Sequence, residues 1–173
     1  MLKSKLKEAL ICFKNLRVTL PYPFQPAPPP EGYRGRVEVD VAKCIGCGAC
    51  AMACPPRLIN ISDVDGRRVI DFRLGRCTYC ARCADVCPVK AIVMSGEFEL
   101  ATDDKADLEL TIELLMVKCE QCDRPFTTQR IRDKLICEVS KGLAIEAGDV
   151  KWLNLCPNCR VVVEVEKISG TGA

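Results

Sequence analysis

Cysteine dominates the residues of this chain that can do chemistry, since its 173 residues include 14 Cys and no His. Eight of the cysteines form two runs of identical spacing, Cys-x2-Cys-x2-Cys-x3-Cys-Pro. The runs are Cys44, Cys47, Cys50, Cys54 and Pro55, then Cys77, Cys80, Cys83, Cys87 and Pro88. This spacing is typical of a chain that holds two [4Fe-4S] clusters, with the fourth cysteine of each run ligating the other cluster.

Such crossed ligation assigns four cysteines to each cluster. One cluster is expected to take Cys44, Cys47, Cys50 and Cys87, and the other Cys77, Cys80, Cys83 and Cys54. Gly46 and Gly48 permit a tight backbone in the first run, whereas the second run has no glycine. Zinc in both sites or a mesh of disulfides is the alternative, which the doubled spacing disfavours. Two clusters on one scaffold indicate electron hopping between them.

A second group of cysteines lies toward the C-terminus. It consists of two Cys-x2-Cys pairs, Cys119 with Cys122 and Cys156 with Cys159. Two such pairs fit a tetrahedral site of four thiolates, for which we expect zinc; a rubredoxin-like iron and a disulfide pair are the alternatives. The remaining Cys12 and Cys137 are predicted to be buried, inert thiols. Trp152 and Leu155 are expected to pack beside the second pair.

The composition indicates a globular, intracellular protein. Hydrophobic residues make up 49% and charged residues 28% of the chain, and the net charge of +2 argues against a nucleic-acid binder driven by bulk charge. The chain does not begin with a cleavable apolar segment, and no run approaches the roughly 20 apolar residues that span a bilayer. We therefore expect a cytosolic protein whose thiols stay reduced and bind metal. The lack of His excludes His-based triads and His-ligated haem.

The elements that must position the cysteines repeat with an offset of 33 residues, the distance from Cys44 to Cys77. Apolar residues alternate before each run, which predicts a short strand, a cysteine loop, a helical turn and a short strand in each half. Residues 97–113 carry seven acidic residues and one Lys and are predicted to form a solvated connector. Strands are predicted at 110–117 and 161–165, and a helix at 126–139.

The N-terminal segment differs from the rest of the chain in charge and in proline content. Residues 2–17 show apolar side chains at helical spacing, with five basic residues and one acidic residue, which predicts a basic amphipathic helix. Residues 21–30 hold six prolines, so we expect an extended, stiff arm there. The alternative for the helix is that its apolar face packs on the protein's own core.

These motifs together resemble a known family over residues 1 to about 100. The basic helix, Thr19-Leu-Pro21-Tyr22-Pro23, Tyr33-Arg34-Gly35-Arg36, the two cysteine runs and Phe98-Glu99-Leu100-Ala101 resemble the eight-iron ferredoxin subunit of complex I and of membrane-bound hydrogenases. The C-terminal stretch Cys119-Glu-Gln-Cys122-Asp-Arg-Pro125-Phe126, with Cys156-Pro-Asn-Cys159, is similar to the ferredoxin-like subunit of formate hydrogenlyase, a group 4 Ni-Fe hydrogenase complex.

The resemblance implies a non-catalytic relay that binds no small-molecule substrate. Electrons would pass from a donor module, such as formate dehydrogenase or ferredoxin, through two [4Fe-4S] clusters to the small subunit of a membrane-bound Ni-Fe hydrogenase. The partners would be the hydrogenase small and large subunits, the electron-donor subunit and a membrane-arm subunit. The N-terminal helix would contact that membrane arm, as a peripheral subunit on the cytoplasmic face of the membrane.

The same sequence features are compatible with three other functions. The chain is alternatively the ferredoxin subunit of a complex-I-like dehydrogenase. A freely diffusing ferredoxin carrier would need no basic helix, proline arm or zinc module. A zinc module that binds nucleic acid or protein is disfavoured by the low aromatic content of 5% and the lack of a basic patch around the C-terminal cysteines.

The expected fold class is α+β: a bacterial two-cluster ferredoxin fold with an N-terminal amphipathic helix and a C-terminal zinc-ribbon-like module. The expected organisation is a docking helix at 1–18, a proline-rich arm at 19–36, a two-cluster ferredoxin domain at 37–96, an acidic connector at 97–117, a four-cysteine module at 118–166 and a tail at 167–173.

Overall fold

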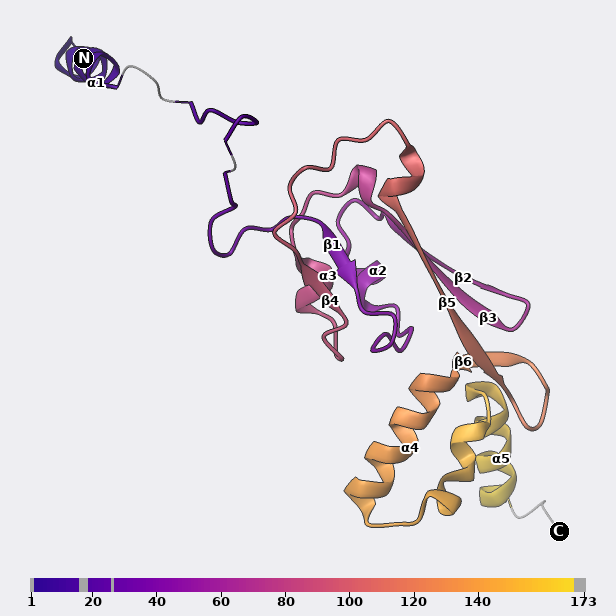
Figure 1. Ribbon diagram of the computed structural model, residues 1–173. Helices are drawn as coiled ribbons and strands as arrows, with labels where there is room; N and C mark the ends of the chain where they lie inside the picture. Colours follow the sequence, from indigo (N-terminus) through magenta and orange to yellow (C-terminus); the bar gives the residue numbers. More distant parts are fainter. Residues whose placement is uncertain (1, 16–18, 26, 170–173) are drawn as a thin grey trace. The chain divides into compact units, whose positions relative to one another are not determined.

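The computed structural model describes residues 2–15, 19–25 and 27–169 and has a mixed α+β architecture (Figure 1). The chain divides into two compact units, Met1–Tyr33 and Arg34–Ala173. All the cysteine motifs belong to the second unit, whereas the basic segment and the prolines belong to the first.

Helix α1, Leu2–Lys14, confirms the amphipathic helix in the first unit, and positions 16 and 17 of the expected span lie outside the described residues. Every described side chain of α1 is exposed, and Phe13 exposes 85% of its surface. The prediction of a buried thiol is therefore wrong for Cys12, because nothing described in this unit packs on the apolar face of its helix. None of the described helices is long and apolar enough to cross a membrane.

The internal repeat appears in the second unit as two similar sequences of secondary-structure elements. The first half contains β1 (Val37–Val39), α2 (Ala49–Ala53) and β2 (Ile59–Val64). The second half contains β3 (Arg67–Arg73), the 3-10 turn η1 (Leu74–Arg76), α3 (Arg82–Asp85) and β4 (Ile92–Met94). The predicted order of strand, cysteine loop, helical turn and strand is thus confirmed in both halves. Strands β1 and β4, from opposite ends of the repeat, pair antiparallel.

The other strands form an antiparallel sheet in the order β2-β3-β5-β6. Asp65 and Gly66 join β2 to β3 with φ angles of 50° and 73°, the left-handed pair that a type I′ hairpin turn requires. After η2 (Lys105–Leu108), strand β5 (Glu109–Lys118) pairs with β3, and β6 (Pro125–Thr128) pairs with β5. Strand β5 confirms the strand predicted at 110–117.

Strand β5 also shows that the predicted solvated connector is wrong in its second half. Ile112 lies opposite Ile70 of β3 and is only 1% exposed. The acidic residues of this stretch, Glu109 and Glu113, occupy alternate positions of the strand and are exposed. Because side chains of a strand alternate between two faces, half of an acid-rich segment can still enter the core.

The sheet, the β1–β4 pair and the cysteine loops share one apolar core. Its fully buried members are Val37, Cys50, Leu58, Ile59, Ile70, Phe72, Leu74, Ile92, Ile112 and Leu114. Five further cysteines pack against this core, namely Cys44, Cys54, Cys77, Cys83 and Cys87. The thiols therefore lie at the boundary between the hydrophobic interior and the cysteine loops.

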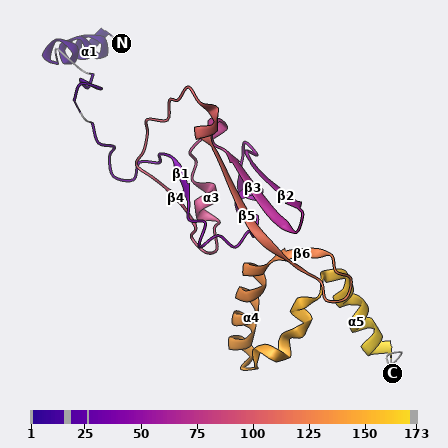
Figure 2. The same ribbon diagram turned by 45° about the vertical axis from the view of Figure 1, so that its right-hand side comes forward.

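Strand β6 leads into the C-terminal helices (Figure 2). These are α4 (Gln129–Leu143), the irregular 3-10 segment η3 (Ala147–Asn154) and α5 (Pro157–Ser169). Helix α4 confirms the helix predicted at 126–139 from Gln129 onward, whereas 126–128 belong to β6. Cys137 is exposed on α4, so its predicted burial is wrong: it shares the outward face with Asp133 and Glu138, whereas the adjacent Ile136 is partly buried.

The strand predicted at 161–165 is also wrong, because these residues belong to α5. A run of β-branched Val favours a strand on propensity alone. However, Pro157 occupies the first helical position, where proline is favoured, and Val161, Val165 and Ile168 follow at helical spacing. The tertiary and capping context outweighs the weak local preference.

Candidate metal centres

The two cysteine loops have matching backbones although only the first contains glycine. Gly46 and Gly48 have φ angles of 76° and 80°. Tyr79 and Ala81, the residues 33 positions later, have φ angles of 51° and 65°. Left-handed conformations are costly for residues with a Cβ atom, so their presence shows that the loop geometry is imposed by the surrounding structure.

The first loop gathers three of its own cysteines and one from the second run. Cys44 interacts electrostatically with Cys47 and with Cys87, and Cys50 interacts with Cys44 and Cys47. Burial raises the pKa of Cys44, and it raises the pKa of Cys50 to about 11, because a thiolate loses its hydration there. Ionised sulfurs at these positions need a cationic partner, as metal ligation provides.

The second loop surrounds a cavity with the complementary set of cysteines. The cavity encloses about 380 Å³ of space between atoms, part of it open to solvent, and Cys54, Cys77, Cys80 and Cys83 line it. Cys77 interacts electrostatically with Cys54 of the first run and with Cys80. Cysteines of both runs thus meet at each loop, Cys87 at the first and Cys54 at the second. The assignment of four ligands to each cluster stays a prediction.

The surroundings of both groups fit an iron-sulfur cluster. Backbone amides point at sulfur: the Tyr79 N–H donates to Cys77 Sγ at 3.4 Å, and the Ala91 N–H donates to Cys87 Sγ at 3.2 Å. The Arg82 amide lowers the pKa of Cys80 in the same way. Apolar Phe72 and Leu74 line the remaining wall of the cavity. Thiolates with amide donors in an apolar shell are the features that hold such clusters and tune their potentials.

Sequence reasoning missed the residues that hold the first cysteine loop from outside. The Arg68 guanidinium donates to the Gly46 carbonyl at 3.1 Å while two of its nitrogens bond both Asp63 oxygens at 2.8 Å. Thr128 and Arg130, at the start of α4, bond three other carbonyls of the loop. The residue type of Thr128 indicates a helix start. No local sequence pattern predicts its contact, or that of Arg130, with a loop more than 80 residues away.

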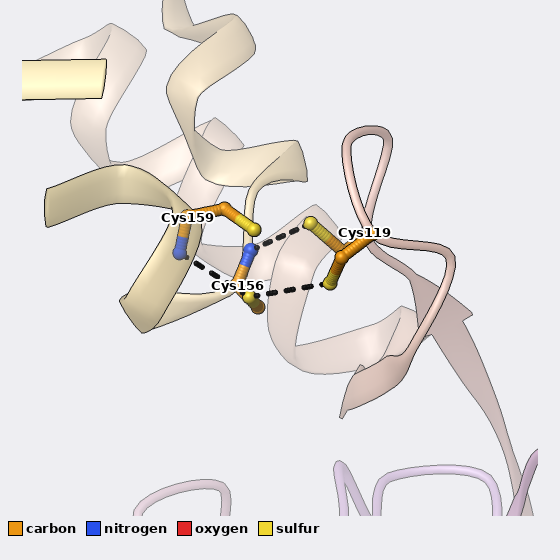
Figure 3. Close-up of side chains that lie close together, drawn as sticks. Cys119, Cys156 and Cys159 are labelled. Atoms are coloured by element: carbon orange, nitrogen blue, oxygen red, sulfur yellow. Dashed lines mark hydrogen bonds between the residues drawn. The ribbon is translucent and has the colours of Figure 1, made fainter. Parts of the chain in front are cut away.

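The four C-terminal cysteines converge on a single point. Their Sγ atoms all lie within 4.8 Å of one another. Cys119 and Cys122 lie in the connection between β5 and β6, whereas Cys156 and Cys159 lie at the start of α5. The Cys156 N–H donates to Cys119 Sγ at 3.2 Å and the Cys159 N–H donates to Cys156 Sγ at 3.5 Å (Figure 3). Four sulfurs this close match the donor set of a tetrahedral metal site.

The electrostatics of the C-terminal site favour the thiolate form of Cys119 and Cys122. The amide of Cys156 lowers the pKa of Cys119 to about 6, and the Arg124 side chain lowers the pKa of Cys122. The hydrogen bond to the Cys156 sulfur raises the pKa of Cys159. Cys119 is therefore ready to bind metal as a thiolate at neutral pH, and the Arg124 charge favours the thiolate of Cys122, while Cys159 must release a proton when metal binds.

Trp152 and Leu155 lie beside the second cysteine pair, as expected, through Arg160. The Arg160 guanidinium stacks 4.8 Å from the centre of the Trp152 ring and donates to the Leu155 carbonyl at 3.2 Å. Arg160 directly follows Cys159, so these contacts fix the start of α5 relative to η3.

Comparison with known proteins agrees with this geometry. The model of the 4Fe-4S dicluster domain matches residues 43–91. Formate hydrogenlyase subunit 6 of Escherichia coli (strain K12) is 36% identical over 150 residues, which cover 85% of this chain and 83% of that protein. The chloroplastic NAD(P)H-quinone oxidoreductase subunit I of Citrus sinensis is 43% identical over 101 residues, covering 54% of this chain and 60% of that protein.

Among solved structures, a chain of the archaeal membrane-bound sulfane sulfur reductase is 34% identical, with a TM-score of 0.41, and the match covers 54% of this chain and 53% of that one. The dicluster domain and the paired cysteine groups define an iron-sulfur electron-transfer subunit with two [4Fe-4S] clusters. The chain belongs to the family of 4Fe-4S dicluster ferredoxin-like subunits that includes formate hydrogenlyase subunit 6, with subunit I of the complex-I-like oxidoreductases as a relative.

Proposed function

We propose that this chain relays electrons inside a membrane-associated hydrogenase complex, from a donor module to the small subunit of a Ni-Fe hydrogenase. The observation that carries the proposal is that Cys87 lies near Cys44 and Cys54 near Cys77, so that each loop meets a cysteine of the other run within one domain. The match to formate hydrogenlyase subunit 6 over most of both chains supports a hydrogenase host.

The proposed ligands are the two crossed groups. Cys44, Cys47, Cys50 and Cys87 would hold one cluster, and Cys77, Cys80, Cys83 and Cys54 the other. When bound, each cluster takes up and releases one electron. The chain supplies the path: α2 and α3 pack against each other, and Cys83 of the second group raises the pKa of Cys50 of the first. Cys50 belongs to the apolar core, and five other proposed ligands pack against it.

In the same proposal the C-terminal site, with Cys119, Cys122, Cys156 and Cys159 as ligands, is structural and holds zinc in a zinc-ribbon-like module at 118–166. Few buried side chains hold this part together, among them Val150 and Leu153. A metal that joins the β5–β6 connection to the start of α5 would stabilise a segment with so small a core.

Helix α1 is proposed to dock the chain on the membrane arm, at the cytoplasmic face of the membrane. Lys3, Lys5 and Lys7 give it positive charge, and Leu6, Leu10 and Phe13 are exposed apolar side chains. Such a helix binds anionic headgroups through its cations and an apolar surface through its other face. Its partners would be the membrane-arm, hydrogenase and donor subunits of one complex.

The similarity to NAD(P)H-quinone oxidoreductase subunit I favours a second host, a complex-I-like dehydrogenase. Purification of the tagged chain from native membranes under anaerobic conditions distinguishes the hosts. Copurification of Ni-Fe hydrogenase subunits supports the proposal, whereas quinone-oxidoreductase subunits support the alternative. Recovery of the chain alone would indicate a diffusing carrier and would refute both.

A ligand variant tests the relay itself. Cys47→Ser should remove one cluster and stop electron passage from donor to hydrogen in the intact complex, whereas Cys137→Ser, an exposed cysteine outside both groups, should leave the rate unchanged. Full donor-to-hydrogen activity in Cys47→Ser would show that electrons take another route.

A further inference from the structure

Side chains at the N-terminal end of α4 donate hydrogen bonds to carbonyl oxygens of the first cysteine loop. Arg130 Nη1 donates to the Cys44 carbonyl at 2.7 Å and also to the Val41 carbonyl. Thr128 Oγ1 donates to the Ile45 carbonyl at 2.5 Å, and the same oxygen accepts the Ile131 N–H as the helix cap. Thr128 is fully buried. Three loop carbonyls are thus held by two side chains of the C-terminal segment.

The first cysteine loop packs so closely against β5 and β6 that a side chain at Gly46 would not fit. A Cβ atom on Gly46 would lie 2.7 Å from Leu114 Cδ1 of β5 and 2.9 Å from Thr128 Cγ2 of β6. The loop that carries Cys44 and Cys47 therefore packs directly on the strands that lead into the C-terminal module. Any displacement of β6 or of the start of α4 would move this loop.

The charge of Arg130 acts on the loop without a neutralising partner. In the described part of the chain no carboxylate forms an ion pair with Arg130, whereas Arg132, two residues later, pairs with Asp133 at 2.8 Å. Asp40, the acid beside the loop, pairs with Lys43 at 2.9 Å. The Arg130 charge lies close enough to Cys44 to lower the pKa of that thiol against the effect of burial.

We propose that Arg130 raises the reduction potential of the cluster ligated by Cys44, and that the C-terminal module holds Arg130 in place for this purpose. The inference rests on the proposed cluster ligands. Reduction adds one electron to the cluster, with no bond broken and no proton transferred. A fixed guanidinium nearby stabilises the more negative, reduced state, because net charge and hydrogen bonding around a cluster set its potential.

Helix α4 contacts only the first loop in the hydrogen bonds described above. The second loop receives a longer contact from another element, since Arg34 Nη1 donates to the Cys80 carbonyl at 3.4 Å. Removal of the Arg130 charge should therefore change the potential of the Cys44 cluster and not that of the other cluster. It is a positioning and tuning residue, because it bonds the loop carbonyls and not the reacting atoms.

Potentiometric titration of the anaerobic, full-length chain, followed by electron paramagnetic resonance, tests this proposal. Arg130→Gln should shift the one-electron equilibrium of one cluster threefold to tenfold toward the oxidised state, where a tenfold shift is about 59 mV. The other cluster should keep its potential, and Cys47→Ser identifies which signal belongs to the Cys44 cluster. Arg130→Lys should retain most of the potential, and the matched control Arg132→Gln should leave both clusters unchanged.

In a second variant the charge at position 130 is changed by pH within one protein, so a change in folding between two proteins cannot cause the effect. The chain contains no His, so Arg130→His introduces the sole side chain that ordinarily titrates near pH 6.5. The potential of the Cys44 cluster in this variant should fall as pH rises from 5.5 to 8 more than it does in the unaltered chain or in Arg132→His.

The outcomes separate this inference from the proposed function. Absence of iron and sulfide from the unaltered chain would overturn both. Two loaded clusters with unshifted potentials in Arg130→Gln, or an equal shift in Arg132→Gln, would overturn the role of Arg130 and leave the relay intact. If Arg130→Gln loses a cluster, a flat pH response of Arg130→His would overturn the role equally well.

Discussion

Ala81 adopts the left-handed backbone conformation of Gly48, its equivalent in the other cysteine loop, with φ angles of 65° and 80°. This conformation costs an L-residue with a Cβ atom about 1–2 kcal/mol, whereas glycine adopts it without that steric cost. The second loop therefore contains backbone strain that the first avoids, although both loops end in the same arrangement of cysteines.

Relief of this strain is measurable. Ala81→Gly should stabilise the chain by about 0.5–1 kcal/mol, since the lost strain exceeds the greater entropy of glycine in the unfolded state. Gly48→Ala should destabilise it, because its new Cβ would also lie 3.1 Å from Ile61 Cδ1. The denaturant midpoint for loss of cluster absorbance reports both effects. Destabilisation by Ala81→Gly would show that this backbone is not strained.

The buried hydroxyl of Thr128 should contribute measurably to stability. Thr128→Val keeps the shape but removes the donor to Ile45 and the cap of α4, and it should cost about 2–3 kcal/mol. Thr128→Ser keeps both hydrogen bonds and should cost about 1 kcal/mol for the lost methyl group. Denaturation of the three proteins under anaerobic conditions gives the comparison, and full stability of Thr128→Val beside a loss for Thr128→Ser would assign the effect to packing alone.

The sequence predicts the repeat well, because the cysteine spacing and the alternating strands are local patterns. Val37 and Ile70 mark the buried faces of β1 and β3 before any coordinates are known. The helix of residues 161–165 is mistaken for a strand since a Val run satisfies both periodicities over so short a window. The length of the segment and its first residue distinguish a helix from a strand. Here Pro157 begins a helix that continues to Ser169.

The contacts that fix the first loop cannot be read from local sequence. Arg130 and Cys44 are 86 residues apart, and an Arg in a helix is usually a solvated surface residue. The burial of Cys12 and Cys137 is mispredicted for a related reason: an apolar neighbour pattern shows that a helix has an apolar face, but not which side chains at its edge are covered. The positive φ of Tyr79 likewise has no signal in a loop without glycine.

Metal binding at the C-terminal site should depend on pH in a manner set by its unequal thiols. Metal competes with protons, so affinity should rise with pH. Above pH 6, Cys119 is already thiolate while Cys159 must lose its proton; below pH 6, Cys119 must lose one too. The slope of log affinity against pH should therefore steepen below about pH 6. Competition with a zinc chelator from pH 5 to 8, under reducing conditions, measures it.

The control for this titration is Arg124→Gln. The Arg124 side chain lowers the pKa of Cys122, so its removal should move the steep part of the curve to higher pH. Cys156→Ser should abolish stoichiometric metal at this site and leave the cluster iron and sulfide in place. A red, redox-active product would identify iron there in place of zinc, and an unchanged slope across the range would contradict the assignment of Cys119 as the acidic thiol.

Charge reversal on α1 tests the docking role of the N-terminal unit. Lys3, Lys5 and Lys7 precede the apolar Leu10 and Phe13 on a fully exposed helix. Each Lys near an anionic bilayer contributes about 1 kcal/mol of attraction, so changing all three to Glu should weaken binding to phosphatidylserine-containing vesicles by more than a hundredfold. Cosedimentation of the full-length chain with these vesicles measures the loss, with Lys134→Glu on α4 as the control. Equal binding by both proteins, or binding insensitive to salt, would exclude an electrostatic docking helix, because attraction to headgroups must weaken as ionic strength rises.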